Sequence, residues 1–125
     1  MSSVPTDPAT VVQRQLDAYN ARDVEALLRV YADDAELYEH PVTLLARGTA
    51  ELRPRFAARF TEANLRADLI HRIVVGGTVI DHERVTRTFP EGPGEIELVM
   101  IYEVRGDRIT RAWTIAGTRR LTPLA

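Results

Sequence analysis

Residues 31–41 read YADDAELYEHP and mark the point where the character of the chain changes. The residues before them have the spacing of amphipathic helices, and the residues after them alternate as strands do. A helix ending at Tyr31 and a strand over residues 35–40 would carry this stretch into the core, with Asp33 and Asp34 as a solvated turn. Pro41 limits the strand, because proline cannot donate to a central ladder. The stretch predicts an α+β protein with helices gathered towards the N-terminus.

Two helices are predicted before this stretch. Thr6 or Asp7 can cap the first, with Pro8 in its first turn. Apolar residues spaced i, i+4 and i+7 place this helix over residues 8–20. Asp23 is a suitable cap for the second helix.

A third helix is predicted to start at Gly48 and Thr49, with apolar positions continuing to Ala63. Pro54 allows two interpretations: the helix begins near Arg53, or it begins earlier and is kinked. Residues 42–47, before this helix, are expected to be a connection without regular structure.

The rest of the chain is predicted to form two hairpins. Residues 65–75 and 78–89 flank Gly76-Gly77, a strong two-residue turn signal. Residues 96–104 and 108–115 flank a second turn at residues 106–107, and residues 90–94 form a bend between the hairpins. The ends, residues 1–6 and 118–125, are expected to be flexible.

Hairpin register predicts which side chains share a face of the sheet. In the first hairpin, His71 opposes His82 and Arg72 opposes Asp81, which favours a cross-strand ion pair. Glu83 shares the face of that pair and becomes a candidate base if this face lines a pocket.

In the second hairpin, Met100 is expected to oppose Trp113, and Tyr102 to oppose Arg111. This would make one bulky face under the helices, where a pocket would form. The other face has smaller β-branched residues and suits contact with a second subunit.

Composition sets limits on function. The chain of 125 residues fits one domain, residues 1–125, and its net charge of −2 gives no electrostatic case for nucleic acid or an anionic membrane. It has no cysteine, which excludes disulfides and thiolate metal sites. No apolar run is long enough to span a bilayer, so a cytoplasmic protein is expected.

The order of helices and strands resembles the NTF2-like, or SnoaL-like, family. The segments that carry the resemblance are residues 19–26 (YNARDVEA), 31–35 (YADDA), 47–48 (RG), 102–104 (YEV) and Trp113. The resemblance covers residues 8–117 and implies a cone-shaped fold, with three N-terminal helices on a strongly curved, mainly antiparallel sheet. It also implies a deep apolar pocket and a homodimer formed through the outer sheet face.

Ketosteroid isomerases are the branch of this family that the pattern resembles most. Their general-base aspartate corresponds to His40, with one extra residue in between. Their two oxyanion-hole donors correspond to Gln15 and Met100, which cannot play the same part. Tyr31 and Trp113 are kept, so the resemblance implies a similar pocket and a different reaction.

His40, His82 and Tyr38 are therefore the candidate catalytic residues, because histidine titrates near neutrality and tyrosine can donate a hydrogen bond to a carbonyl oxygen. A metal site would need His40, His71 and His82 to converge, and neither metal nor cofactor is expected. The residues expected to contact a ligand are Gln15, Tyr19, Tyr31, Phe56, Phe60, His71, Met100, Tyr102, Arg111 and Trp113.

Two functions remain open from the sequence. One is an isomerase, cyclase or dehydratase that uses histidine to move a proton on a small, apolar, carbonyl-bearing molecule. The other is a module that binds a small ligand or dimerises without catalysis.

Overall fold

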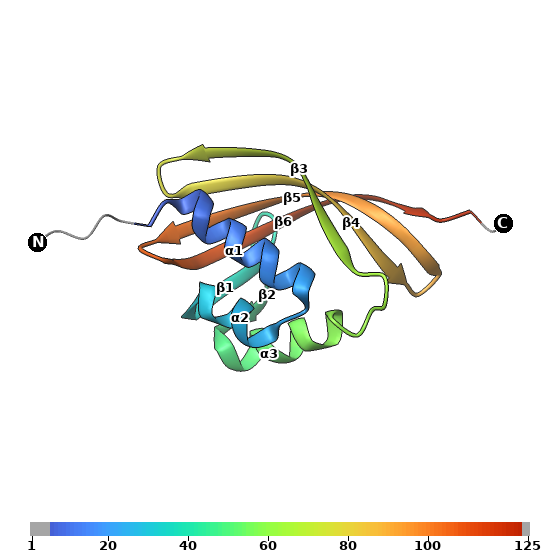
Figure 1. Ribbon diagram of the computed structural model, residues 1–125, viewed down its shortest axis with the longest axis horizontal. Coiled ribbons are helices and arrows are strands. Elements are labelled where there is room, and N and C mark those ends of the chain that lie inside the picture. The colour runs from blue at the N-terminus through green and yellow to red at the C-terminus, as the bar shows by residue number, and fades with distance from the viewer. Residues whose placement is uncertain (1–5, 124–125) are drawn as a thin grey trace, which may run out of the picture.

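Three helices cover one side of a six-stranded sheet in the computed structural model, which describes residues 6–123 (Figure 1). The helices are α1 (Pro8–Ala21), α2 (Val24–Val30) and α3 (Gly48–Arg59). The strands are β1 (Tyr31–Glu39), β2 (Thr43–Arg47), β3 (Arg66–Val75), β4 (Thr78–Phe89), β5 (Gly92–Arg105) and β6 (Arg108–Leu121). The strand order is β2-β1-β6-β5-β4-β3, and only the β1–β6 pair is parallel among these strands. The predicted α+β class and curved, mainly antiparallel sheet are confirmed.

Side chains and backbone geometry set the helix boundaries. Asp7 caps α1 by accepting a hydrogen bond from Ala9 N at 2.9 Å, and Asp23 caps α2 by accepting from Ala26 N at 3.0 Å. Between them, Arg22 adopts a left-handed conformation, with φ 56°, that ends α1. The third helix begins at Gly48, so Pro54 lies inside it and the alternative start near Arg53 is wrong.

The sheet is longer than predicted at four places. The first strand starts at Tyr31, and the expected connection over residues 42–47 contains β2. The bend between hairpins shortens because β5 begins at Gly92. The last strand continues to Leu121, which pairs with Gly94, so residues 118–121 are part of the sheet. Residues 1–5 of the predicted flexible arm lie outside the described residues.

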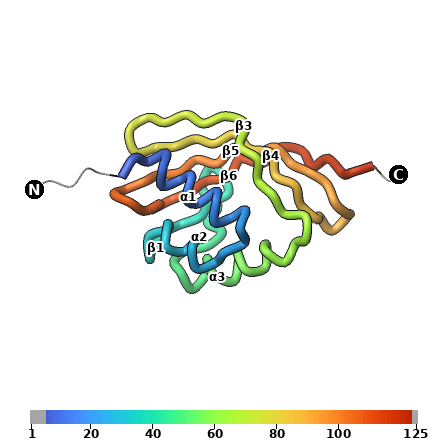
Figure 2. The backbone as a smooth tube through the Cα atoms, viewed as in Figure 1, coloured from blue at the N-terminus to red at the C-terminus, as the bar shows by residue number. Residues whose placement is uncertain are grey.

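Helices α1 and α3 lie against the inner face of the sheet, and β3 to β6 continue beyond them (Figure 2). One apolar cluster joins all three helices to the sheet through residues such as Val11, Leu27 and Leu52, which are fully buried. A second cluster surrounds Phe89 near the far ends of β3, β4 and β5. The core therefore follows the curvature of the sheet.

The side chain of Asn20 fastens the end of α1 to β3. Its Nδ2 donates to Ala67 O at 2.9 Å, and its Oδ1 accepts from Ala67 N at 2.8 Å. These two hydrogen bonds join residues 47 positions apart in the chain. They satisfy both backbone groups of one residue at the edge strand and fix where α1 crosses the sheet.

Replacing Asn20 should test this attachment. Asn20→Ala removes both hydrogen bonds and should lower the free energy of unfolding by about 1–3 kcal/mol. Asn20→Asp keeps the acceptor and should lose less. Urea unfolding followed by circular dichroism measures both variants, and equal midpoints for Asn20→Ala and the parent chain would contradict the assigned role.

Candidate functional site

A cavity of about 360 Å³ lies between the helices α1 and α3 and the inner face of the sheet. Its size falls within the range of small-molecule sites. Most of its wall is apolar, from Leu16, Leu37, Leu45, Val85, Ile96, Leu98 and Met100. Polar and charged side chains form the rest of the wall.

Six of the predicted ligand contacts line this cavity: Gln15, Tyr19, Tyr31, Phe56, Met100 and Tyr102. Phe60 lies behind the wall, where its ring packs edge-on against Tyr19 at 5.5 Å between centroids. The six lining residues come from α1, β1, α3 and the inner face of β5.

The inner side of β6 differs from the prediction because of a bulge. Val104 opposes Ile109, but the next pair is Glu103 with Arg111, so one residue of β6 is skipped. An extra residue on one strand exchanges the faces of all side chains beyond it. Met100 consequently opposes Thr114, and the expected Met100–Trp113 pair is wrong.

Thr114 and Ala116 line the cavity in place of the predicted Arg111 and Trp113. Arg111 is exposed and pairs with Glu36, with its Nε 3.1 Å from Glu36 Oε1. Trp113 stacks on Tyr38 with ring centroids 5.6 Å apart. Neither Tyr38 nor Trp113 contributes to the cavity wall. On β1 the inward residues are Leu37 and Glu39, and on β6 they are Thr114 and Ala116.

The three histidines also lie outside the cavity wall. His40 follows β1 and is exposed. His71 opposes His82 as predicted, but His82 faces outward and its Nε2 lies 3.4 Å from Glu97 Oε2. Within residues 6–123, no group of three His, Asp or Glu side chains is placed to hold a metal ion.

Glu83, on β4, is a buried acidic residue that lines the cavity. Its side chain is buried, with 4% of the residue exposed, and Oε2 has no hydrogen-bond partner. Burial, as the main cause, and the negative charge of Asp81 together raise the pKa of Glu83 to about 8, against the opposing effect of Arg72. The carboxyl therefore holds its proton at neutral pH and can still lose it in a mildly alkaline range.

The neighbouring Asp81 is buried in a different way. Arg72 binds it through two hydrogen bonds, of 2.7 and 2.9 Å, and also donates to Gln13 Oε1 at 3.0 Å. This confirms the predicted cross-strand ion pair. Because Arg72 is fully engaged with Asp81, it leaves Glu83 without a direct cationic partner.

Two tyrosine hydroxyls and one amide also belong to the wall near Glu83. Tyr102 donates to Gln15 Oε1 at 3.2 Å across the buried interior. Burial raises the pKa of both Tyr31 and Tyr102, and the nearby Glu83 raises both further. Both phenols therefore remain protonated and can donate hydrogen bonds.

The sequence does contain a pattern which indicates that Glu83 faces the core. Val79, Asp81, Glu83 and Val85 alternate along β4, and the two valines are buried. Buried apolar residues on both sides of a charged pair indicate that the pair faces the core. The separate observation of an Arg72–Asp81 pair on the same face agrees with that interpretation.

The structure is a cone-shaped α+β protein with an internal cavity, and the comparisons identify its family. The SnoaL-like domain profile matches residues 12–112. This chain belongs to the SnoaL-like family, within the NTF2-like fold. The part of the chain that the structure describes contains no helix long and apolar enough to cross a membrane.

Several solved structures share this fold. An uncharacterised cystatin-fold protein from Novosphingobium aromaticivorans is 26% identical, with a TM-score of 0.78, covering 88% of this chain and 98% of its own. AclR, a putative hydroxylase from Streptomyces galilaeus, is 13% identical, with a TM-score of 0.76 and 91% of each chain covered. A putative polyketide cyclase from Sinorhizobium meliloti is 23% identical, with a TM-score of 0.70, covering 85% of this chain and 94% of its own. No curated protein matched the chain.

The raised pKa of Glu83 makes folding depend on pH. The unfolded carboxyl has an ordinary pKa of 4.5 and the folded one a pKa of about 8, so the folded state binds more protons between these values. Stability contributed by this group is therefore present below pH 4.5 and is lost as pH rises through 8, by up to about 1.4 kcal/mol per pH unit.

Glu83→Gln should remove this dependence while keeping the size of the side chain. Urea unfolding at several pH values from 5 to about 8.5 should show the variant gaining stability relative to the parent chain as pH rises. Parallel stability curves would mean that the Glu83 carboxyl is not held in its neutral form by the fold.

Proposed function

We propose that this protein binds a small, mostly apolar carbonyl compound in the cavity and that Glu83 moves a proton on it. The observation that carries the proposal is the buried Glu83 carboxyl, whose Oε2 has no partner in the wall of an apolar cavity. A buried titratable group directed into a cavity is a mark of functional sites. The reaction class would be isomerisation, cyclisation or dehydration.

The proposed chemistry follows from the groups around the carboxyl. The ionised Glu83 takes a proton from the carbon next to the carbonyl, and the Tyr31 or Tyr102 hydroxyl donates a hydrogen bond to the oxygen that gains charge. The protonated Glu83 then returns the proton at another carbon, which completes an isomerisation. A pKa of about 8 suits both steps near neutral pH.

Glu83 takes the place that the sequence had given to histidine. His40 and His82 remain outside the cavity wall, so a histidine would have to act from another surface. The supporting context is the family itself, in which relatives of the same fold include a putative polyketide cyclase and a putative hydroxylase.

Binding without turnover is the second candidate function. Tyr102 already donates its hydroxyl hydrogen to Gln15. A ligand oxygen would have to displace that contact or use Tyr31 alone. This observation favours a module that holds a ligand without activating its carbonyl.

Exchange of carbon-bound protons separates the two candidates. Apolar cyclic ketones such as 2-tetralone would be incubated with the protein in deuterated buffer, and loss of the α-proton signal followed by NMR. Catalysed exchange should fall by roughly 10²–10⁴-fold in Glu83→Gln. His82→Gln serves as the matched control and should exchange at the parent rate. Ligand binding without exchange would establish the non-catalytic alternative.

We also infer that two copies pair through the outer face of the sheet. An apolar row crosses all six strands in register and consists of Ile73, Ile80, Ile101, Trp113, Tyr38 and Leu44. Ile73 and Leu44, at the two ends, are 48% and 43% exposed. A continuous apolar row on a face without helices suits a self-complementary interface.

Sedimentation tests this pairing. The parent chain should sediment at twice its 14.0 kDa mass, and Ile101→Arg, in the middle of the row, should shift it to monomer at micromolar concentration. Val42→Arg, at a side chain that is 78% exposed in the β1–β2 turn, is the control and should remain dimeric. A monomeric parent chain would rule out the interface.

A further inference from the structure

Four arginines line the end of the cavity that lies away from Glu83: Arg55, Arg59, Arg87 and Arg119. Arg55 and Arg59 come from the last turns of α3, Arg87 from the end of β4 and Arg119 from the end of β6. Three elements that are distant in sequence thus bring guanidinium groups to one place. We call these four residues the arginine cluster.

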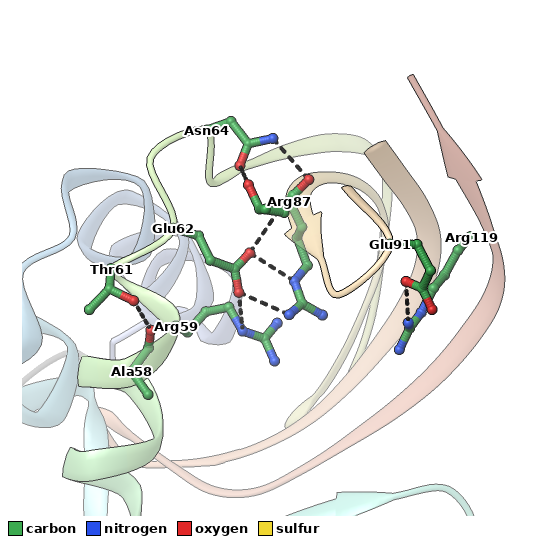
Figure 3. Close-up of polar contacts among 9 residues, drawn as sticks. Ala58, Arg59, Thr61, Glu62, Asn64, Arg87, Glu91 and Arg119 are labelled. Atoms are coloured by element: carbon green, nitrogen blue, oxygen red, sulfur yellow. Dashed lines mark hydrogen bonds and ion pairs between the residues drawn. The ribbon is translucent and has the colours of Figure 1, made fainter. Parts of the chain in front are cut away.

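Their contacts hold three of the four in position. Arg87 Nη2 lies 2.9 Å from Glu62 Oε2, and Arg59 Nε lies 3.5 Å from the same oxygen. Arg119 pairs with Glu91 at 3.4 Å (Figure 3). The guanidinium carbons of Arg87 and Arg119 also lie 5.0 and 4.7 Å from the ring centroid of Phe89, so both are positioned by one buried ring.

Arg55 has no such partner within residues 6–123, where no carboxylate forms an ion pair with it. Burial and the like charges of Arg59 and Arg87 lower its pKa. The arginines of the cluster outnumber the carboxylates around them even when Glu39 of the wall is counted with Glu62 and Glu91. Positive charge at the rim of an apolar cavity is therefore left uncompensated.

We propose that the ligand is an amphipathic anion, whose carboxylate, sulfonate or similar group is bound by Arg55 with Arg59 and Arg87 while its apolar body fills the cavity. This inference rests on the proposed function and names the substrate class for it. Guanidinium groups bind such anions through charge-assisted, often bidentate hydrogen bonds.

The spacing along β4 sets the length of this ligand. Glu83 and Arg87 are four residues apart on one strand, and a strand rises about 3.3 Å per residue, so the two ends of the site are separated by roughly 13 Å. The reacting carbonyl and the anionic group would thus lie at opposite ends of an elongated molecule of two or three fused or linked rings.

A matched pair of fluorescent probes can test the anion site. One probe is 6-(p-toluidino)-2-naphthalenesulfonate, an elongated apolar molecule with a sulfonate at one end. The other is N-(p-tolyl)-2-naphthylamine, which has the same rings without the sulfonate. The parent chain should bind the sulfonate about tenfold or more tightly than the neutral probe, and the preference should weaken with added salt.

Arg55→Gln should remove most of the preference for the sulfonate and leave the affinity for the neutral probe unchanged. Arg55→Lys, which keeps the charge, should retain part of it. Arg53→Gln is the matched control, two residues earlier on α3, because Arg53 pairs with Glu25 on α2 and does not line the cavity. Ala116→Trp, which fills the cavity from β6, should weaken both probes and so locate them.

The outcomes separate this inference from the proposed function. Equal affinities for the two probes, or an unchanged sulfonate preference in Arg55→Gln, would overturn the anion site while leaving the apolar pocket and Glu83 in place. Failure of both probes to bind, or binding that Ala116→Trp leaves intact, would overturn the pocket and the anion site together. If the parent chain catalyses no proton exchange in the earlier experiment, the proposed proton transfer fails, but the anion site is not affected.

Discussion

Alternation of side chains along a strand is the constraint on which the cavity depends. Every second residue of β1, β4, β5 and β6 faces the helices, so one residue of register decides what a ligand would meet. In β6, the register shift opposite Glu103 and Val104 sets which side chains face the cavity. It turns Thr114 and Ala116 inward and leaves Trp113 to stack on Tyr38 outside, which keeps the largest ring of the sheet out of the cavity.

The interior treats its two buried carboxyls differently. Asp81 is paired with Arg72, whose two hydrogen bonds compensate for the loss of hydration. Glu83, two residues further along β4, has apolar neighbours and protonated phenols around it. Burial favours the neutral form of Glu83, which raises its pKa. The same physical effect that weakens the protein at high pH gives Glu83 a pKa of about 8, which suits the proton transfer proposed for it.

Charge along β4 gives the cavity two chemically distinct ends. The end near α1 has Glu83 with the hydroxyls of Tyr31 and Tyr102, and the end near the last turn of α3 has the arginine cluster. Glu62 forms ion pairs with both Arg59 and Arg87. Its negative charge offsets the repulsion between the two guanidinium groups. The apolar wall between these ends provides the contact area that binds most small ligands.

Local sequence determined much of the architecture. Asp7 and Asp23 specify helix starts, and Gly76-Gly77 fixes the first hairpin and with it the His71–His82 and Arg72–Asp81 pairs. The tertiary structure alone decided the wall of the site. The bulge in the second hairpin has no local residue signal, and the burial of Glu83 depends on α1, which packs against β4 from elsewhere in the chain. His40 and His82 were predicted to be catalytic from residue type, but the position of a side chain inside or outside the cavity is a property of the assembled fold.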